Sequence, residues 1–344
     1  MSGYFPIIQR MIDAPVYGVT FTTKQDNLSV PANSIVRWDG TGSTGITGLA
    51  AVNGTVTIIN ASTDYLLWLE NENTASSAAN RLMLPDGFWA FLMPGDTITL
   101  WYDTTTSRWR VLSWPTRGMQ GGLTIFDDFV HGSLVIGSTM FGIGAQGTGS
   151  GVGPSGWGVT TTDRAMGAAR LTTGTATTGS GWAGSYTSHT LFGMGNMLMV
   201  GAFARSAATD GTDTFTITCG ISDFTADGAA WEYRWNGSVV EYGYNALSGG
   251  VATRTAVAAI NPATVGNSYV HAAVFLPQSS AAADFLYSLD GVAWTLAGRT
   301  TTGLPTWANN SRAAGPYAGI VKSAGTTSRD CYLDYMGFRS DQAR

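Results

Sequence analysis

Residues 231–244, WEYRWNGSVVEYGY, show most clearly how this chain folds. Aromatic residues alternate with charged or small residues on both sides of Asn236-Gly237, and a period of two is the pattern of a strand whose two faces differ. Asn-Gly favours the type I′ turn of a two-residue hairpin. The stretch therefore predicts two antiparallel strands joined at Asn236-Gly237.

Short strands and turn residues continue on both sides of this hairpin. Residues 34–113 contain a series of apolar runs separated by turn-forming pairs such as Asp86-Gly87 and Pro94-Gly95. The composition agrees, because 45 glycines and 45 threonines in 344 residues favour strands and tight turns. The sequence predicts an all-β protein.

Proline and glycine interrupt the strand pattern at residues 116–122, which we interpret as a linker. Residues 1–30 have no clear period and are expected to form a peripheral N-terminal arm. Residues 31–115 predict a small antiparallel β domain. Residues 123–344 have many short strands without interleaved helices and a second hairpin signal at Asp290-Gly291, which predicts a larger β-sandwich of the jelly-roll type.

Charge and hydropathy exclude several classes of protein. The net charge is −5, and the 18 Lys and Arg residues form no basic cluster, so we expect no nucleic-acid partner. The apolar runs are much shorter than a bilayer-spanning helix, and the start of the chain does not have the pattern of a signal peptide. Cys219 and Cys331 lie in strand-like sequence; we expect buried thiols, with a disulfide or a metal site as alternatives.

The carboxylates give little sign of catalysis. Glu70, Glu72, Glu232 and Glu241 are the only glutamates. A glycosidase needs two carboxyl groups flanking the scissile bond. Glu232 and Glu241 flank the predicted turn and could meet on paired strands, but solvated residues on an exposed hairpin are the simpler interpretation. No nucleophile motif lies in a strand-turn-helix context, so we expect no enzymatic activity.

A calcium ion is the one cofactor that the sequence suggests. Asp127-Asp128 could bind Ca²⁺ together with backbone carbonyls. The alternative is that one aspartate caps a turn while Phe126 and Phe129 enter the core. We otherwise expect no cofactor.

Aromatic residues are the candidate ligand-binding groups. The rings of the 231–244 hairpin either fill the core or, where one face is open, form a platform on which sugar rings stack. Tryptophans in glycine-rich loops have fewer neighbours to bury them and are the better candidates. The complete candidate set is Trp157, Trp182, Trp231, Trp235, Tyr242 and Tyr244.

Two groups of short motifs, one in each expected domain, carry information beyond composition. In the smaller domain, AANR (78–81), PGDTITLWYD (94–103) and SRWRV (107–111) occur in the order typical of a small β domain of phage fibre and tail proteins. In the larger domain, FDDF (126–129), SLDGVAW (288–294) and DCYLDYMGFR (330–339) resemble the concanavalin-like jelly rolls at the ends of phage virion proteins.

This resemblance implies a structural protein of the virion, a tail or head fibre, that is assembled in the host cytoplasm. The arm would attach to other virion proteins, and the distal sandwich would bind a host-surface glycan without catalysis. The resemblance also implies a homotrimer. A capsid decoration or head-fibre protein with a mainly structural role is the alternative, and a polysaccharide-degrading tail protein is a third reading.

Overall fold

The computed structural model describes residues 14–114, 122–127, 142–146, 169–184, 195–205, 213–222, 228–236, 240–248, 251–261, 265, 268–278, 282–304 and 315–341. The regular elements named within these residues are strands, apart from the short 3₁₀ helices η1 (Ala78–Asn80) and η2 (Pro85–Gly87). The prediction of an all-β protein is therefore confirmed. No helix among the described residues has the length and apolarity needed to span a bilayer.

The chain divides into two compact units. Unit 1 consists of Met1–Gln120 together with Gly291–Trp294, and unit 2 consists of Gly121–Asp290 and Thr295–Arg344. Unit 1 is therefore discontinuous in sequence. The predicted linker, residues 116–122, lies outside the described residues except for Gly122.

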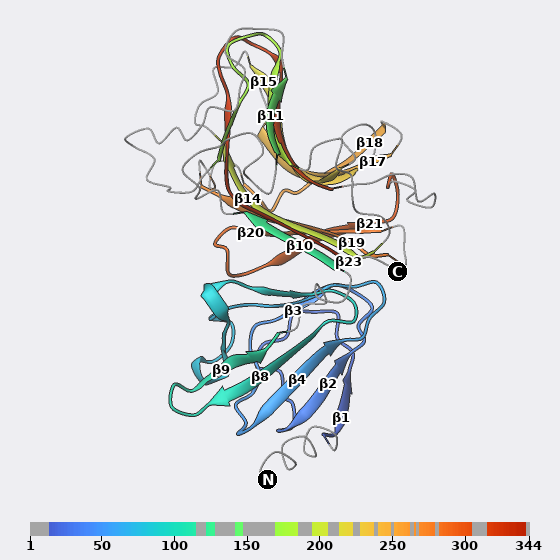
Figure 1. Cartoon of the computed structure of the whole chain (residues 1–344), viewed down its shortest axis with the longest axis vertical. Helices are drawn as coiled ribbons and strands as arrows, with labels where there is room; N and C mark the ends of the chain where they lie inside the picture. The colour runs from blue at the N-terminus through green and yellow to red at the C-terminus, as the bar shows by residue number, and fades with distance from the viewer. Residues whose placement is uncertain are drawn as a thin grey trace. The chain divides into compact units, whose positions relative to one another are not determined.

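Unit 1 contains a six-stranded sheet in the order β1-β2-β4-β8-β9-β6 and a three-stranded sheet in the order β3-β5-β7 (Figure 1). The strands of the larger sheet are β1 (Val16–Val19), β2 (Ser34–Trp38), β4 (Thr55–Asn60), β8 (Thr97–Asp103), β9 (Arg108–Ser113) and β6 (Leu82–Met83). Those of the smaller sheet are β3 (Thr44–Ile46), β5 (Leu67–Leu69) and β7 (Ala90–Leu92).

Two predictions for this unit were wrong. The sheets are mixed rather than antiparallel, because β1–β2, β2–β4, β6–β9 and β3–β5 pair in parallel. The expected arm, residues 1–30, is part of the fold from Val16 onward: β1 pairs with β2, and Val30 is buried. Residues 1–13 lie outside the described residues.

Two tryptophans anchor the unit 1 core. Trp38 and Trp109 are fully buried, and each indole N–H donates to a backbone carbonyl, that of Phe21 at 3.1 Å and that of Leu49 at 3.0 Å. Their polar atoms are therefore satisfied inside the core. The predicted reversals at Gly87 and Gly95 have positive φ angles of 75° and 83°, which glycine adopts without strain.

The segment Gly291–Trp294 contributes a further buried tryptophan to unit 1. The Trp294 ring is fully buried, with its centroid 4.9 Å from that of Trp89 and 5.1 Å from that of Phe91. Its carbonyl accepts a hydrogen bond from Lys24 Nζ at 2.7 Å, and its N–H donates to Glu70 Oε1 at 3.0 Å. Backbone and ring are thus both held within the unit.

Glu70 is the centre of the polar contacts around Trp294. Its carboxylate is fully buried and forms an ion pair with Lys24 Nζ at 2.8 Å. It also accepts hydrogen bonds from Trp68 Nε1 at 2.9 Å and from Asn73 Nδ2. A buried charge is tolerated only when it is paired and hydrogen-bonded in this way.

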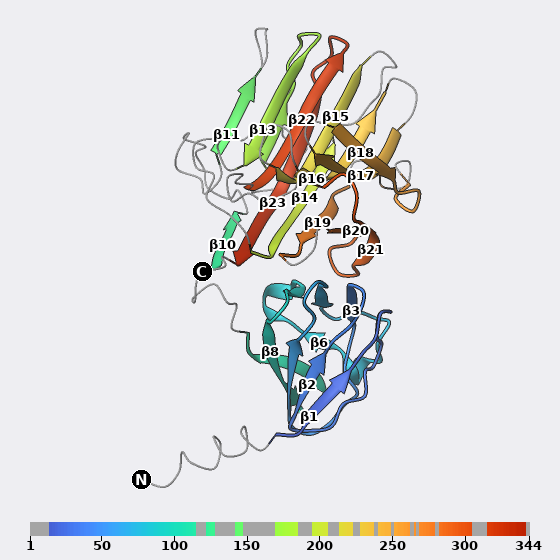
Figure 2. The same cartoon turned by 90° about the vertical axis from the view of Figure 1, so that its right-hand side faces the viewer.

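Unit 2 is a sandwich of two seven-stranded sheets (Figures 1 and 2). The β14 sheet has the order β10-β23-β14-β19-β20-β21, with β12 also paired with β23. Its strands are β10 (Gly122–Asp127), β12 (Ala169–Thr172), β14 (Met197–Arg205), β19 (Val270–Leu276), β20 (Ala283–Ser288), β21 (Thr295–Thr300) and β23 (Asp330–Asp341).

The β15 sheet has the order β11-β13-β22-β15-β16-β17-β18, and Figure 2 shows these strands side by side. Its strands are β11 (Gly142–Gln146), β13 (Gly179–Gly184), β15 (Thr214–Ser222), β16 (Gly228–Trp235), β17 (Val240–Ser248), β18 (Val251–Ala256) and β22 (Gly315–Ala324). Neighbouring strands pair antiparallel in both sheets, so the predicted β-sandwich is confirmed.

Both predicted hairpins pair antiparallel. β16 and β17 pair with Trp235 opposite Val240, and Gly237 of the expected Asn236-Gly237 turn lies outside the described residues. β20 and β21 pair with Tyr287 opposite Thr295, and residues 289–294 connect the two strands, a longer connection than the expected two-residue turn. Within this connection, Asp290 belongs to unit 2, and Gly291 begins the segment that belongs to unit 1.

The unit 2 core contains both cysteines. Cys219 and Cys331 are buried free thiols, as expected, and form no disulfide. Burial raises the pKa of Cys219 to about 12, so this thiol is protonated and unreactive at neutral pH.

Candidate functional site

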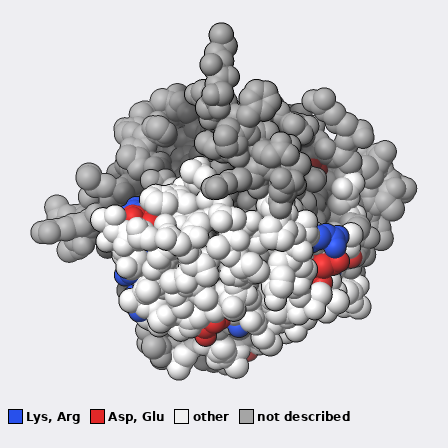
Figure 3. All heavy atoms as spheres, turned by 90° about the horizontal axis from the view of Figure 1, so that it is seen from below, with Lys and Arg blue, Asp and Glu red and all other residues white. Residues whose placement is uncertain are grey.

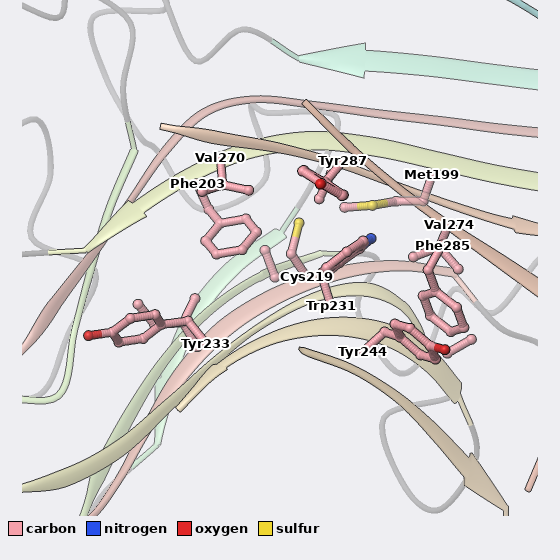
Figure 4. Packing of buried hydrophobic residues seen from close by; sticks show 14 of the residues in the cluster. Met199, Phe203, Cys219, Trp231, Tyr233, Tyr244, Val270, Val274, Phe285 and Tyr287 are labelled. Atoms are coloured by element: carbon pink, nitrogen blue, oxygen red, sulfur yellow. The ribbon is translucent and has the colours of Figure 1, made fainter. Parts of the chain in front are cut away.

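The four aromatic residues of the 231–244 hairpin lie in the core of unit 2. Trp231, Trp235, Tyr242 and Tyr244 are all buried between the two sheets (Figure 4). Their ring faces are occupied by other core side chains; Tyr244, for instance, stacks on Phe285 at 4.3 Å. The interpretation of these rings as core residues is therefore correct, and their candidacy as sugar platforms is withdrawn.

The remaining predicted site residues are only partly described. Trp182 lies on β13 rather than in a loop, and its backbone pairs with Gly319. Asp127 ends β10 opposite Met336. Trp157 and Asp128 lie outside the described residues, so the calcium site stays a prediction. Within the part of the chain that is described, no group of His, Cys, Asp and Glu has the arrangement of a metal site.

The outer face of the β15 sheet presents polar and small residues. On β15, Phe215, Ile217 and Cys219 enter the core, so the intervening Thr216 and Thr218 face outward. The pairing register aligns Thr218 with Gly319 on one side and with Glu232 on the other. The backbone of Trp182 pairs with Gly319, so Trp182 lies on the next strand at the same level of the sheet.

A charged cluster occupies one end of this face; we call it the Glu232 cluster, comprising Glu232, Arg234, Glu241, Asn245 and Arg254. Arg254 bridges the two carboxylates: its Nε lies 3.1 Å from Glu232 Oε2 and its Nη1 lies 2.8 Å from Glu241 Oε2. Asn245 Nδ2 donates to Glu232 Oε1 at 2.9 Å, and Arg234 Nη2 lies 3.6 Å from Glu232. These contacts fix both carboxylates in orientation.

Glycine at position 243 makes room for the bridge. A Cβ atom there would lie 2.9 Å from Arg254 Nη2 and 2.6 Å from the Thr255 carbonyl oxygen. The guanidinium therefore lies directly over the glycine backbone. Arg254 comes from β18, an edge strand whose residues are otherwise mostly exposed, so the cluster also holds this strand to the sheet.

Tyr317 provides an aromatic ring on the same face. Its hydroxyl and ring edge lie over Gly319, where a Cβ atom would come within 2.3 Å of the Tyr317 Oη. Burial raises the pKa of this phenol, so it is a neutral donor at physiological pH. Gly319 and Glu232 lie two strand spacings apart, about 10 Å. Sequence reasoning missed Tyr317; the signal was an aromatic residue framed by glycines in GPYAGI (315–320).

The two carboxylates of the cluster differ in accessibility. The Glu232 side chain is 7% exposed and Glu241 is 41% exposed. The expectation that both are solvated was therefore wrong for Glu232, because Arg254 and Asn245 cover and pair it. Of the two carboxylates, only Glu241 is accessible to an external ligand without rearrangement of the cluster.

Several charged side chains of unit 1 also lie beside a side chain of opposite charge. In Figure 3, Lys and Arg lie next to Asp and Glu in small groups, and most of the described surface in that view is uncharged. In unit 1, Arg37–Asp39, Arg108–Glu72 and Arg110–Asp103 form such pairs. This distribution is not that of a nucleic-acid interface.

Comparisons with known proteins find similarity in structure alone. No family model and no curated protein matches the chain. A protein of unknown function from Shewanella oneidensis MR-1 has a TM-score of 0.43 at 10% identity over 65% of this chain and 90% of its own. The CBM2 module of the Dit protein of Lactobacillus casei BL23 phage J-1 has 0.43 at 9% identity, over 65% and 98%. Peanut lectin has 0.41 at 9% identity, over 64% and 97%.

These similarities are low in both identity and TM-score. The fold of this chain is therefore taken from its own strand pairing: two units, both all-β, the larger a two-sheet sandwich with a structured polar face.

Proposed function

We propose that this chain is a phage virion structural protein whose larger unit binds a host-surface glycan through the outer face of the β15 sheet, without catalysis. The observation that carries the proposal is the Glu232 cluster, a preorganised set of hydrogen-bonding groups on the same face as Tyr317. Sugar sites combine a few fixed polar groups with an aromatic surface. The virion assignment rests on the motif resemblance of both units.

Binding without chemistry is supported by the state of the two carboxylates. Hydrolysis of a glycosidic bond requires one carboxyl group as acid and a second as nucleophile or base, both in reach of the sugar. Glu232 is buried and paired, and Glu241 shares Arg254 with it. We propose no catalytic residue and no cofactor.

Adsorption of the purified full-length protein to host cells tests this function. We expect Arg254→Ala to reduce cell binding at least tenfold, because both carboxylates lose the group that orients them. Arg108→Ala removes a comparable Arg–Glu pair in unit 1 and serves as the matched control. Equal binding by wild type and Arg254→Ala, with both proteins folded, would exclude this face as the site.

The position in the virion is tested separately. A gold-labelled antibody against residues 123–344 on intact particles should mark the tail or its fibres if the protein serves adsorption. Label over the capsid would instead favour the structural role in decoration or head fibres. Mass measurement of the purified protein by light scattering tests the proposed homotrimer.

A further inference from the structure

The outer face of the larger sheet of unit 1 carries an open tryptophan. On β8, Ile98 and Leu100 enter the core, so Trp101, which follows them in the alternation, faces outward and is 37% exposed. Among the described residues, its ring packs against no other aromatic ring and its Nε1 makes no hydrogen bond. The buried Trp38 and Trp109 of the same unit, in contrast, both donate from Nε1.

The strand register places a polar side chain on each side of Trp101. Trp101 pairs with Thr55 of β4 and with Arg110 of β9. Directly opposed residues share a face of the sheet, so these three side chains form a row across β4, β8 and β9 (Figure 1). Two strand spacings separate the ends of the row, about 10 Å.

Arg110 is fixed in position and retains donors. Its Nε lies 2.8 Å from Asp103 Oδ2, which also accepts from Thr106 Oγ1 at 2.7 Å, while Asp103 Oδ1 accepts from the Thr105 N–H at 3.0 Å. The contact from Arg110 Nη2 to Thr106 Oγ1 is long, at 3.5 Å. The side chain is 35% exposed. A guanidinium has five N–H donors, so those of the two terminal nitrogens are available to a ligand.

We propose that unit 1 has a glycan-binding site of its own, in which a sugar ring packs on Trp101 and its hydroxyl groups bond to Arg110 and Thr55. The inference goes beyond the proposed function, because this site lies on a different unit from the Glu232 cluster. A sugar ring has an apolar C–H face and a rim of hydroxyl groups, and its sites combine an aromatic surface with a few fixed polar groups.

The surroundings of Trp101 are complementary to hydroxyl groups. The outward positions of β4 and β8 next to the ring are mostly threonine, and the hydroxyls of two of them lie 3.0 Å apart. Hydroxyl groups both donate and accept, and Arg110 adds N–H donors, so a sugar hydroxyl finds a partner in either role. The threonines are Thr55, Thr57, Thr97 and Thr99.

The charges on this sheet do not favour a nucleic acid as the ligand. Its arginines, Arg37, Arg108 and Arg110, each lie beside a carboxylate, and its strands contain no lysine. Binding to a phosphate backbone depends on a group of unpaired cations. Stacking on Trp101 therefore supports a sugar ring rather than a base of a nucleic acid.

Binding of soluble glycans to the immobilised full-length protein tests the site. The probes are dextran, mannan, galactan, N-acetylglucosamine oligomers, polygalacturonate and polysialic acid, and interferometry measures Kd. We expect at least one probe whose Kd rises by about fivefold or more in Trp101→Ala, because the stacking surface is lost. Trp101→Phe keeps an aromatic ring and should stay within about threefold of the wild type. Phe88→Ala removes a 45% exposed aromatic residue outside this sheet and should leave Kd unchanged.

Arg110→Ala tests the polar part of the site. The Kd of the same probe should rise by about threefold or more, because hydrogen bonds to a charged donor are lost. Arg37→Ala is the matched control: it removes an exposed Arg–Asp pair from β2 of the same sheet and should have no effect. Circular dichroism of each variant verifies that the fold is intact.

The unit 2 variant Arg254→Ala separates this site from the proposed function. A probe that loses affinity in Trp101→Ala but not in Arg254→Ala supports the unit 1 site. Loss in Arg254→Ala, with every probe unaffected by Trp101→Ala, overturns this inference and leaves the proposed function intact. An equal loss in Phe88→Ala and Trp101→Ala also overturns the assignment to Trp101. Failure to bind any probe overturns both proposals.

Discussion

Trp231 lies at the centre of the unit 2 core. Its ring is edge-on to those of Tyr244, Phe285 and Tyr287, and its Nε1 donates to the Ala273 carbonyl at 3.1 Å. Ala273 belongs to the β14 sheet and Trp231 to the β15 sheet, so one side chain links both layers through packing and a hydrogen bond (Figure 4).

Trp231→Ala should therefore destabilise unit 2 by about 3–5 kcal/mol, the range for removal of a buried aromatic side chain. Chemical unfolding followed by circular dichroism measures the change. Trp101 is 37% exposed in unit 1, and Trp101→Ala should change stability by no more than about 0.5 kcal/mol. Similar losses for the two variants would contradict the assignment of Trp231 to the core.

His271 makes the stability of unit 2 depend on pH. Its Nδ1 lies 2.9 Å from Tyr335 Oη, and burial lowers its pKa below the usual 6.5, an effect that nearby Asp290 partly offsets. The unfolded chain then binds a proton more readily than the folded chain. The stabilisation is complete above pH 6.5 and is lost as the pH falls toward the folded pKa.

We accordingly expect His271→Gln to lose less stability than the wild type between about pH 7.5 and about pH 5.5. Urea midpoints at the two pH values provide the measurement. Other groups titrate in this range in both proteins, so the comparison isolates His271. Parallel pH profiles would show that His271 does not contribute.

The residue types in the sequence predicted which side chains are buried better than they predicted which side chains bind a ligand. The alternation of Trp231, Tyr233 and Trp235 identified a ring-bearing face, but sequence alone left open whether a second layer covers that face. The β14 sheet supplies that layer from residues more distant in the chain. Glu232 was mistaken for a solvated residue for the same reason, since its partner Arg254 lies on a strand whose pairing the sequence did not reveal.

At the scale of elements, β18 depends on few contacts beyond its pairing with β17. Val251 is 70% exposed, and most of the strand faces solvent on both sides. Arg254 connects β18 to carboxylates on β16 and β17, so the ion pairs cross three strands. An edge strand held in this way is a local unit that can open before the sheet does.

Arg254→Ala should therefore increase hydrogen exchange of the β18 amides while the β15 amides stay protected. Mass-spectrometric hydrogen exchange on the intact protein resolves the two strands. Equal protection of β18 in wild type and variant would mean that backbone pairing alone holds this strand.

Strand positions were predictable and strand pairings were not. Runs such as TVTIIN and TITLWYD became β4 and β8 because their period of two is a local property. Parallel pairing of β1 with β2 and of β2 with β4 depends on chain crossovers, which leave no local signal. The connection at residues 289–294 likewise overrides the two-residue turn signal at Asp290-Gly291.

At the scale of the whole molecule, Trp294 is the residue that makes unit 1 discontinuous. Trp294→Ala should destabilise unit 1 by about 3–5 kcal/mol, although the residue lies far along the chain from the rest of that unit. Calorimetry should show a lower melting temperature for the unit 1 transition. Trp101→Ala, on the surface of the same unit, is again the control, and an unchanged transition in Trp294→Ala would show that Trp294 adds nothing to this core.

The sequence predicted a linker at residues 116–122 because proline and glycine cluster there, and the contact division changes units between Gln120 and Gly121. It did not predict the return of Gly291–Trp294, since SLDGVAW has the features of an ordinary hairpin turn.

The position of Trp294 in the sequence also determines when, during translation, the core of unit 1 can be completed. On the ribosome, Gln120 is made well before Trp294, and at roughly 5–20 residues per second the interval between them is on the order of 10–30 seconds. During that interval Glu70 has no Trp294 N–H to accept from, and Trp89 and Phe91 have no third ring. Unit 1 therefore begins to fold first, but its core is complete only when most of the chain has been translated. In the usual order, an N-terminal unit is completely folded before the next unit starts to fold.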